Sequence, residues 1–213
     1  MSKIYIGAGH GGKDPGAVSG KNQEKDFNLG IANKVANLLK QAGHDVLQNR
    51  TTDIDSDIND KAAQANKWGA DLCLDIHLNA GGGTGTEAYY QHTNAKSKAF
   101  ATAVSKALSA AFGWRNRGAK IKTYKDGGKT LDYFGMVRLP KCPAVLIEVC
   151  FIDSAADMAK LDTDKAAKVI ADTVLELYPA PAKDTDKAVK VGDTVTLNGY
   201  LYADSYGSTK GRK

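Results

Sequence analysis

The stretch Lys3-Ile-Tyr-Ile-Gly-Ala-Gly-His-Gly-Gly-Lys-Asp-Pro-Gly16 carries most of the information about the fold. Its first half alternates β-branched and aromatic residues, which is typical of a strand. Glycines then surround His10, so the backbone there has very little bulk. In α/β proteins, binding and catalytic sites form at the carboxyl ends of strands. His10 is therefore a candidate metal ligand or acid/base, with an incidental surface histidine on a tight turn as the alternative.

The glycines also fit two phosphate-binding patterns, G-x-G-x-x-G and, over residues 7–13, most of a phosphate loop. Both patterns need a helix to begin at once, so that its N-terminus faces the phosphate. Here Asp14 replaces the Ser or Thr of the phosphate loop, and Gly16 favours an extended loop. Helical periodicity begins only near Glu24. The sequence therefore argues against a nucleotide site.

Strand and helix patterns alternate from residue 3 to residue 178. Helices are expected over residues 24–42, 58–68, 94–112 and 154–177, and further strands over 44–47, 71–77, 86–91 and 144–149. Ser154 and Asp157 are expected to start the last helix as a capping box. Residues 119–138 are mixed and loop-rich. This order predicts an α/β fold with a single twisted, mostly parallel sheet, flanked by helices on both faces.

The chain divides into three parts. Residues 1–178 form the expected catalytic domain, and residues 179–188 are a polar linker rich in Pro and Ala. Residues 189–213 alternate like a β-hairpin, but about 25 residues cannot bury a stable core alone. We expect this short β-type C-terminal tail to be the start of an incomplete small domain.

Composition is that of an ordinary globular protein, with 42% hydrophobic and 25% charged residues and a net charge of +5. No basic stripe with interleaved aromatics indicates nucleic-acid binding. No apolar run approaches the roughly 20 residues of a membrane span, and no signal peptide is recognisable. The three cysteines, Cys73, Cys142 and Cys150, are expected to be reduced and mostly buried.

Four polar residues stand at strand ends or interrupt apolar runs: His10, Glu24, His77 and Glu148. A parallel sheet would bring the carboxyl ends of its strands, and the first turn of the first helix, to one edge. Two imidazoles and one carboxylate leave Zn²⁺ an open position for water, as in catalytic sites. A second carboxylate can then move the proton. His10, Glu24 and His77 are therefore candidate zinc ligands, and Glu148 is the candidate base.

Simpler interpretations remain open for each partner of His10. Glu24 is favourable near a helix N-terminus through the helix dipole alone. His77 fits an ordinary hydrogen-bonded histidine at a strand end. Glu148 is harder to dismiss, because an unpaired carboxylate among Val, Leu and Ile is costly. An ion pair with Arg138 or Lys141 would explain it without catalysis.

One further residue bears on the site. Asp75 lies two residues before His77 and so on the same face of the strand. It is either a hydrogen-bond partner of the His77 imidazole outside the metal's own ligand set, or a solvated strand-edge residue. His44 and His92 border turns and are expected at the surface.

Several short motifs occur together in a fixed order. They are Gly9-His-Gly-Gly-Lys-Asp-Pro-Gly-Ala17, Glu24, Ile76-His-Leu-Asn-Ala80, Gly85-Thr-Glu-Ala-Tyr-Tyr90 and Pro143-Ala-Val-Leu-Ile-Glu-Val-Cys-Phe-Ile152. The set, over residues 3–178, resembles the zinc-dependent N-acetylmuramoyl-L-alanine amidases of the amidase-3 type, found in bacterial autolysins and phage endolysins. The resemblance implies one zinc ion on His10, Glu24 and His77, with Glu148 as catalytic acid/base.

The resemblance also implies hydrolysis of the amide between N-acetylmuramic acid and L-alanine of the peptidoglycan stem peptide. Asn79 and Arg117 are candidate substrate contacts. The chain departs from the family at Gly7-Ala8, often Asp-Pro, at Asp75, often Ser, and at Cys150, often Gly. The alternatives are a zinc peptidase acting on the stem peptide and a non-catalytic wall-binding module.

No signal peptide is recognisable, and a linker leads to an unfinished tail. These features favour an endolysin of phage or prophage origin. Such an enzyme would be made in the cytoplasm and would act on the cell wall after release through a holin. The tail would then bind a cell-wall polymer.

Overall fold

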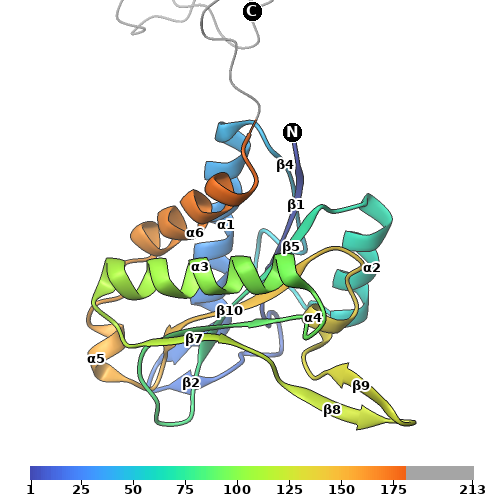
Figure 1. The fold of residues 1–213 in the computed structure, drawn as a ribbon. Helices are drawn as coiled ribbons and strands as arrows, with labels where there is room; N and C mark the ends of the chain where they lie inside the picture. Colours follow the sequence, from blue (N-terminus) through green and yellow to red (C-terminus); the bar gives the residue numbers. More distant parts are fainter. Residues whose placement is uncertain (181–213) are drawn as a thin grey trace, which may run out of the picture. The chain divides into compact units, whose positions relative to one another are not determined.

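A six-stranded sheet lies at the centre of the computed structural model, which describes residues 1–180 (Figure 1). The strand order is β4-β1-β5-β10-β6-β7. The bounds are β4 Asp45–Gln48, β1 Lys3–Ala8, β5 Leu72–Asn79, β10 Ala144–Phe151, β6 Thr86–Tyr90 and β7 Asn116–Lys120. Every neighbouring pair is parallel except β10 and β6. The predicted mostly parallel sheet is confirmed.

The sheet is buried on both faces because apolar residues fill both sides of its strands. Ile4 and Ile6 point into the larger core, whereas Tyr5 between them points into a smaller one. Leu74 and Cys73 divide between the same two cores. This is the period of two expected for a strand, and it explains why these segments read as nearly continuous apolar runs.

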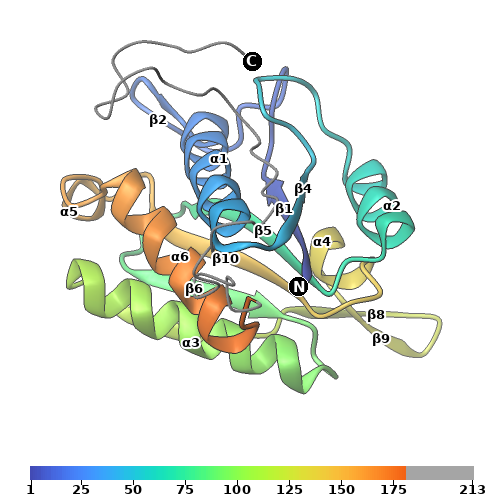
Figure 2. The same cartoon turned by 90° about the horizontal axis from the view of Figure 1, so that it is seen from above.

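Helices cover both faces of the sheet, as expected. The larger core lies under α1 Glu24–Ala42, α3 Ala95–Phe112 and α6 Thr163–Leu177. On the other face, α2 Ile58–Trp68 and α4 Gly135–Arg138 pack over Tyr5 and Cys73. Figure 2 shows these two groups on opposite sides of the strands.

The single helix expected from Ser154 to Leu177 is wrong. The chain forms the short α5, Ala155–Met158, and then α6 begins separately at Thr163. Ser154 does cap α5, since its side chain accepts a hydrogen bond from the Asp157 backbone N–H. A second cap follows, because the Asp162 side chain accepts from the first backbone N–H groups of α6. Two N-caps start two helices.

Residues expected to be loop-rich contain a β-hairpin. Its strands are β8 Thr123–Asp126 and β9 Lys129–Asp132. Gly127 and Gly128 connect them with positive φ angles of 52° and 79°. Two consecutive positive φ values are the requirement of the tightest hairpin turn, which glycine meets without strain. A second small pair, β2 Val18–Ser19 and β3 Asn22–Gln23, precedes α1.

The expectation that His44 lies at the surface is wrong, because its side chain is 4% exposed. Gly43 ends α1 in the left-handed conformation and turns the chain back. The His44 backbone N–H then donates to the Leu39 carbonyl, which holds the residue against the helix end. His92 is partly exposed and lies 3.0 Å from Asp132 Oδ1 through its Nδ1 atom.

The remaining expectations concern the cysteines, a membrane span and the C-terminal tail. Cys73 and Cys150 are buried, Cys142 is partly buried, and all three are free. None of the helices in residues 1–180 has the length and apolar character needed to cross a membrane. The β-type tail over residues 189–213, and most of the linker over residues 179–188, lie outside the described residues.

Candidate metal centre and catalytic site

The glycine-rich loop places His10 beyond the end of β1. His10 has a φ of 59° and is the one non-glycine residue with positive φ between residues 1 and 180. Such a conformation is costly outside glycine and often marks a functional site. No helix follows the loop directly, because β2 and β3 come first and α1 begins only at Glu24. This agrees with the argument against a phosphate site.

Small residues in the loop leave room for the site's side chains. A Cβ atom at Gly9 would lie 2.2 Å from the His77 ring. A Cβ atom at Gly16 would lie 2.6 Å from the His10 ring and 2.7 Å from Glu24 Oε2. Any larger residue at either position would displace one of these side chains.

Glu24 is the first residue of α1 and is 4% exposed. Its Oε2 atom accepts from the Ala17 backbone N–H at 2.9 Å, and Oε1 accepts from the Leu78 backbone N–H at 3.1 Å. Burial alone would raise the pKa of Glu24, but hydrogen bonds from His10 and His77 lower it well below its usual range. Glu24 is thus held as a carboxylate, the form that binds metal.

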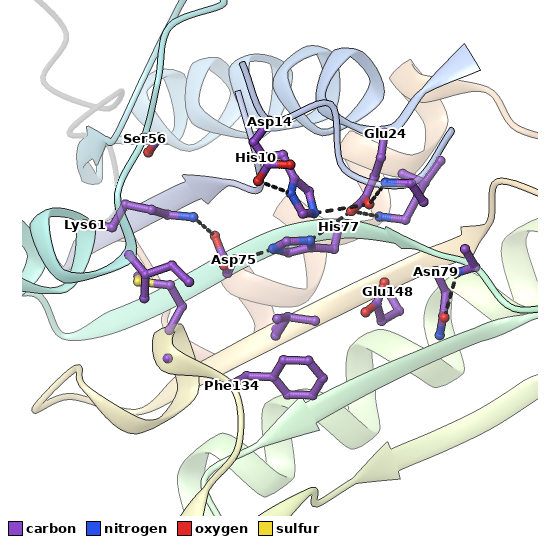
Figure 3. Close-up of a pocket in the computed structure, with 17 residues that line it drawn as sticks. His10, Asp14, Glu24, Ser56, Lys61, Asp75, His77, Asn79, Phe134 and Glu148 are labelled. Carbon is purple, nitrogen blue, oxygen red and sulfur yellow. Dashed lines mark hydrogen bonds and ion pairs between the residues drawn. The ribbon is translucent and has the colours of Figure 1, made fainter. Parts of the chain in front are cut away.

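Both imidazoles converge on this carboxylate (Figure 3). His10 Nε2 lies 3.2 Å from Glu24 Oε2, and His77 Nδ1 lies 2.9 Å from Glu24 Oε1. One ligand atom from each of these three residues lies within 4.8 Å of the other two. Two ring nitrogens and a carboxylate oxygen at this spacing fit Zn²⁺ with an open position. The predicted ligand set is therefore brought together.

Each imidazole directs its second nitrogen to another carboxylate. His10 Nδ1 lies 2.7 Å from Asp14 Oδ2, and His77 Nε2 lies 3.1 Å from Asp75 Oδ2. Such outer carboxylates fix the orientation and tautomer of a metal-binding histidine. The predicted contact of Asp75 is present, whereas Asp14 was not selected from the sequence as a partner of His10.

Glu148 lies beside the cluster, on β10. Its Oε2 atom is buried and has no hydrogen-bond partner in the described part of the chain. Burial raises the pKa of Glu148 to about 7, the charges of Glu24 and Glu87 add to the rise, and His77 opposes it. Within residues 1–180 neither Arg138 nor Lys141 forms the alternative ion pair with Glu148, and the Arg138 guanidinium donates to backbone carbonyls instead.

A cavity of about 380 Å³ joins Glu148 to the metal ligands. One wall of the cavity is apolar. It consists of Ile58 from α2, Phe134 and Met136 at α4, and Leu146 from β10. Asn79 and Lys61 also line the cavity. The other residues that line the cavity are mostly polar or charged, so the cavity combines one apolar wall with a polar site.

Both candidate substrate contacts bind Glu87, which sequence reasoning missed. Asn79 Nδ2 donates to Glu87 Oε1 at 2.9 Å, and Arg117 forms an ion pair with Glu87 Oε2. Lys120 Nζ lies 2.6 Å from the same oxygen. Glu87 is 2% exposed and is the β6 register partner of Glu148. The sequence feature that could have identified Glu87 is a carboxylate within a short strand that is otherwise uncharged.

Comparison with known proteins places the chain in a family. A family model described as N-acetylmuramoyl-L-alanine amidase matches residues 4–177. The chain belongs to the N-acetylmuramoyl-L-alanine amidase family. The match covers every residue of the proposed metal and catalytic set.

Individual relatives agree with this assignment. The sporulation-specific N-acetylmuramoyl-L-alanine amidase of Bacillus subtilis is 36% identical over 174 residues, which cover 80% of this chain and 64% of that protein. The endolysin of Bacillus phage SPP1 is 36% identical over 178 residues, or 81% of this chain and 63% of the relative. The chain thus spans under two thirds of both relatives.

A solved structure shows the same fold. The catalytic domain of CwlV, an N-acetylmuramoyl-L-alanine amidase from Bacillus (Paenibacillus) polymyxa var. colistinus, is 35% identical with a TM-score of 0.73. The similarity covers 83% of this chain and 97% of that domain. The mostly parallel sheet with helices on both faces is therefore the fold of the family.

Proposed function

We propose that this protein hydrolyses the amide bond between N-acetylmuramic acid and L-alanine of peptidoglycan. Membership of the amidase family supports the substrate. The observation that carries the chemistry is the convergence of His10, Glu24 and His77 next to Glu148, whose buried Oε2 atom has no partner within residues 1–180. Such a carboxylate is positioned to exchange a proton with a bound group.

One Zn²⁺ would be held by a ring nitrogen of His10, a ring nitrogen of His77 and the carboxylate of Glu24. When bound, Zn²⁺ supplies a Lewis acid that polarises a carbonyl and lowers the pKa of water. The protein's contribution is the ligand geometry. The loop glycines leave room for the three side chains, and backbone hydrogen bonds fix the Glu24 carboxylate.

Glu148 would act as general base and then as general acid. It would accept a proton from the attacking water and deliver a proton to the alanine nitrogen as the amide bond breaks. A pKa of about 7 lets the same carboxyl group do both near neutral pH. Phe134, Met136 and Leu146 line the same cavity and give it an apolar wall.

Asn79 and Arg117 are proposed to contact the substrate at the Glu87 side of the site. Asn79 lines the cavity directly. The Arg117 side chain is 26% exposed and reaches Glu87 through its Nε atom, so its remaining N–H groups can meet an acidic stem peptide. Glu87 would hold both side chains in register with Glu148.

The decisive experiment is digestion of purified peptidoglycan with and without a chelator. We expect new N-terminal alanine, no new reducing sugar ends, and loss of both product and activity on chelation. Other new stem-peptide ends would instead indicate a zinc peptidase. Binding to the wall without any cleavage, in protein shown to contain zinc, would indicate a non-catalytic wall-binding module.

Two proposals concern the protein beyond its site. The alternating pattern of residues 189–213 supports a role in binding a cell-wall polymer. Removal of residues after 180 should then weaken sedimentation with purified walls, while cleavage of soluble muropeptides is unchanged.

The similarity to a phage endolysin supports synthesis in the cytoplasm and release through a holin. Fractionation of producing cells with and without a holin tests this; wall lysis without one contradicts it.

A further inference from the structure

A buried ion pair adjoins the proposed metal ligands. Lys61 Nζ on α2 lies 2.7 Å from Asp75 Oδ1 on β5, and the two side chains are 4% and 3% exposed. Figure 3 shows Lys61 reaching across the cavity wall to Asp75. Burying two charges carries a large desolvation cost for each ion, and their mutual attraction repays that cost only in good geometry. Stability alone is therefore a weak reason for this pair.

The pair is connected to a metal ligand. Asp75 has two carboxylate oxygens, and each has a different partner: Oδ1 meets Lys61, and Oδ2 lies 3.1 Å from His77 Nε2. The bond to Lys61 fixes the rotation of the carboxylate, and so fixes where Oδ2 accepts. A proton held on His77 Nε2 leaves Nδ1, which lies 2.9 Å from Glu24 Oε1, as the ring nitrogen that can give its lone pair to a metal. This is the tautomer that can bind a metal beside Glu24.

A glycine on the neighbouring strand β1 leaves space for this ion pair. Gly7 on β1 is the register partner of Asp75. A Cβ atom at Gly7 would lie 2.1 Å from Asp75 Oδ1 and 3.2 Å from Lys61 Cε. Any other residue at position 7 would push the carboxylate or the lysine away. Three elements, β1, β5 and α2, therefore combine to place one ion pair behind His77.

The two histidines differ in this respect. Asp14, the outer carboxylate of His10, is 66% exposed and lies on the same loop as its histidine. In contrast, Asp75 is held in the interior by a cation from another element. The carboxylate behind His10 is thus exposed to solvent, whereas the carboxylate behind His77 is buried and ion-paired.

We propose that Lys61 is a positioning residue that, through Asp75 and the space left by Gly7, sets the tautomer and ring orientation of His77 for metal binding. The inference rests on the proposed metal site. Loss of Lys61 would leave Asp75 Oδ1 without its partner, free the carboxylate to rotate, and remove the fixed acceptor for His77 Nε2–H. The metal-binding nitrogen would then be less well presented.

The test is zinc affinity, measured on the full chain by competition with a chelating dye. We compare Lys61→Met, which keeps most of the side-chain length but removes the charge, with Lys168→Met, which removes an exposed lysine from a surface pair on α6. We expect about a tenfold loss of affinity for Lys61→Met, at the low end for outer partners of metal ligands. Lys168→Met should match the wild type.

The Co²⁺-loaded forms provide a readout of ligand geometry independent of turnover. We expect the visible absorption bands of the Lys61→Met variant to shift, with no shift for Lys168→Met. Folded Lys61→Met protein with zinc affinity within twofold of the control, and unshifted bands, would overturn the proposal. Circular dichroism establishes folding.

A measurement on the wild type covers the case in which Lys61→Met does not fold. Nitrogen-15 NMR of the zinc-loaded protein should find the His77 proton on Nε2 and no proton on Nδ1. A proton on Nδ1 overturns the positioning role. A wild-type chain that binds no zinc at all overturns the metal site itself, so the two failures are distinguishable.

Discussion

Glu148 and His77 are register partners on the neighbouring parallel strands β10 and β5. Residues paired in this way point to the same face of a sheet, so the strand pairing alone brings the proposed base next to a proposed metal ligand. Glu87 continues the row on β6, since it pairs with Glu148 from the other side. The electrostatic environment of Glu148 is therefore set by sheet register.

Replacement of Glu148 should separate chemistry from metal binding. In Glu148→Gln the side chain keeps its volume but cannot accept a proton, so we expect a loss of turnover of about 100- to 10,000-fold. Zinc content should be unchanged, because the three proposed ligands remain. Glu176→Gln, an exposed change on α6, is the matched control. Loss of zinc together with activity would show that Glu148 is a ligand instead.

The pH dependence of activity should show an acid limb from Glu148. Its pKa is raised to about 7, mainly by burial, and protonation removes the base, so kcat/KM should fall as the pH drops through this region. Bound zinc, being positive, shifts the limb to lower pH. Assays of soluble muropeptide cleavage between pH 5 and 9, a range of roughly two units about the raised value, give the profile.

Substitution of Glu87 should move this limb. The negative charge of Glu87 helps to raise the pKa of Glu148, so Glu87→Gln should lower that pKa. The substitution also leaves Arg117 and Lys120 without their carboxylate, and two uncompensated cations act in the same direction. The acid limb is expected at lower pH than in the wild type. A limb at the same or higher pH would contradict this account.

Two glycine-to-alanine changes should have opposite effects. In Gly9→Ala the new Cβ would lie 2.2 Å from the His77 ring, so we expect weaker zinc binding and destabilisation by about 1–3 kcal/mol. Gly30 lies within α1 with nothing within 4 Å of an added Cβ. Gly30→Ala should stabilise the protein by about 0.5–1 kcal/mol. Thermal unfolding and zinc titration measure both.

Metal removal should lower thermal stability as well as activity. If zinc binds the folded chain and not the unfolded chain, it stabilises the fold by about 4 kcal/mol when the free zinc concentration is a thousand times the dissociation constant. We therefore expect the unfolding temperature to fall on chelation and to recover when zinc is restored. An unfolding temperature independent of zinc would mean that His10, Glu24 and His77 do not bind it.

Sequence reasoning located the proposed ligands because each stands at a strand end or helix start, where a parallel sheet collects its polar residues. It missed residues whose role depends on a partner elsewhere. Lys61 is part of an ordinary amphipathic helix, and only the packing of α2 on the sheet brings it to Asp75. Glu87 likewise acquires its role through pairing with β10.

Local turns account for the remaining errors. The interruption between α5 and α6 depends on Asp162 acting as a second cap, although the apolar pattern continues across it. His44 is buried because of the backbone turn at Gly43, which hydrophobic periodicity does not report. The β8–β9 hairpin has little apolar alternation and was visible only in its paired glycines.

The position of β10 has a consequence for how the protein is made. This strand is added to the chain after β1, β4, β5, β6 and β7, yet it lies between β5 and β6 in the finished sheet. A nascent chain has all three proposed zinc ligands once residue 77 is synthesised, but it can neither close the sheet nor present Glu148 until the last strand inserts. The same strand therefore completes the sheet and supplies the proposed base, so a chain that ends before β10 has the three proposed ligands but not Glu148.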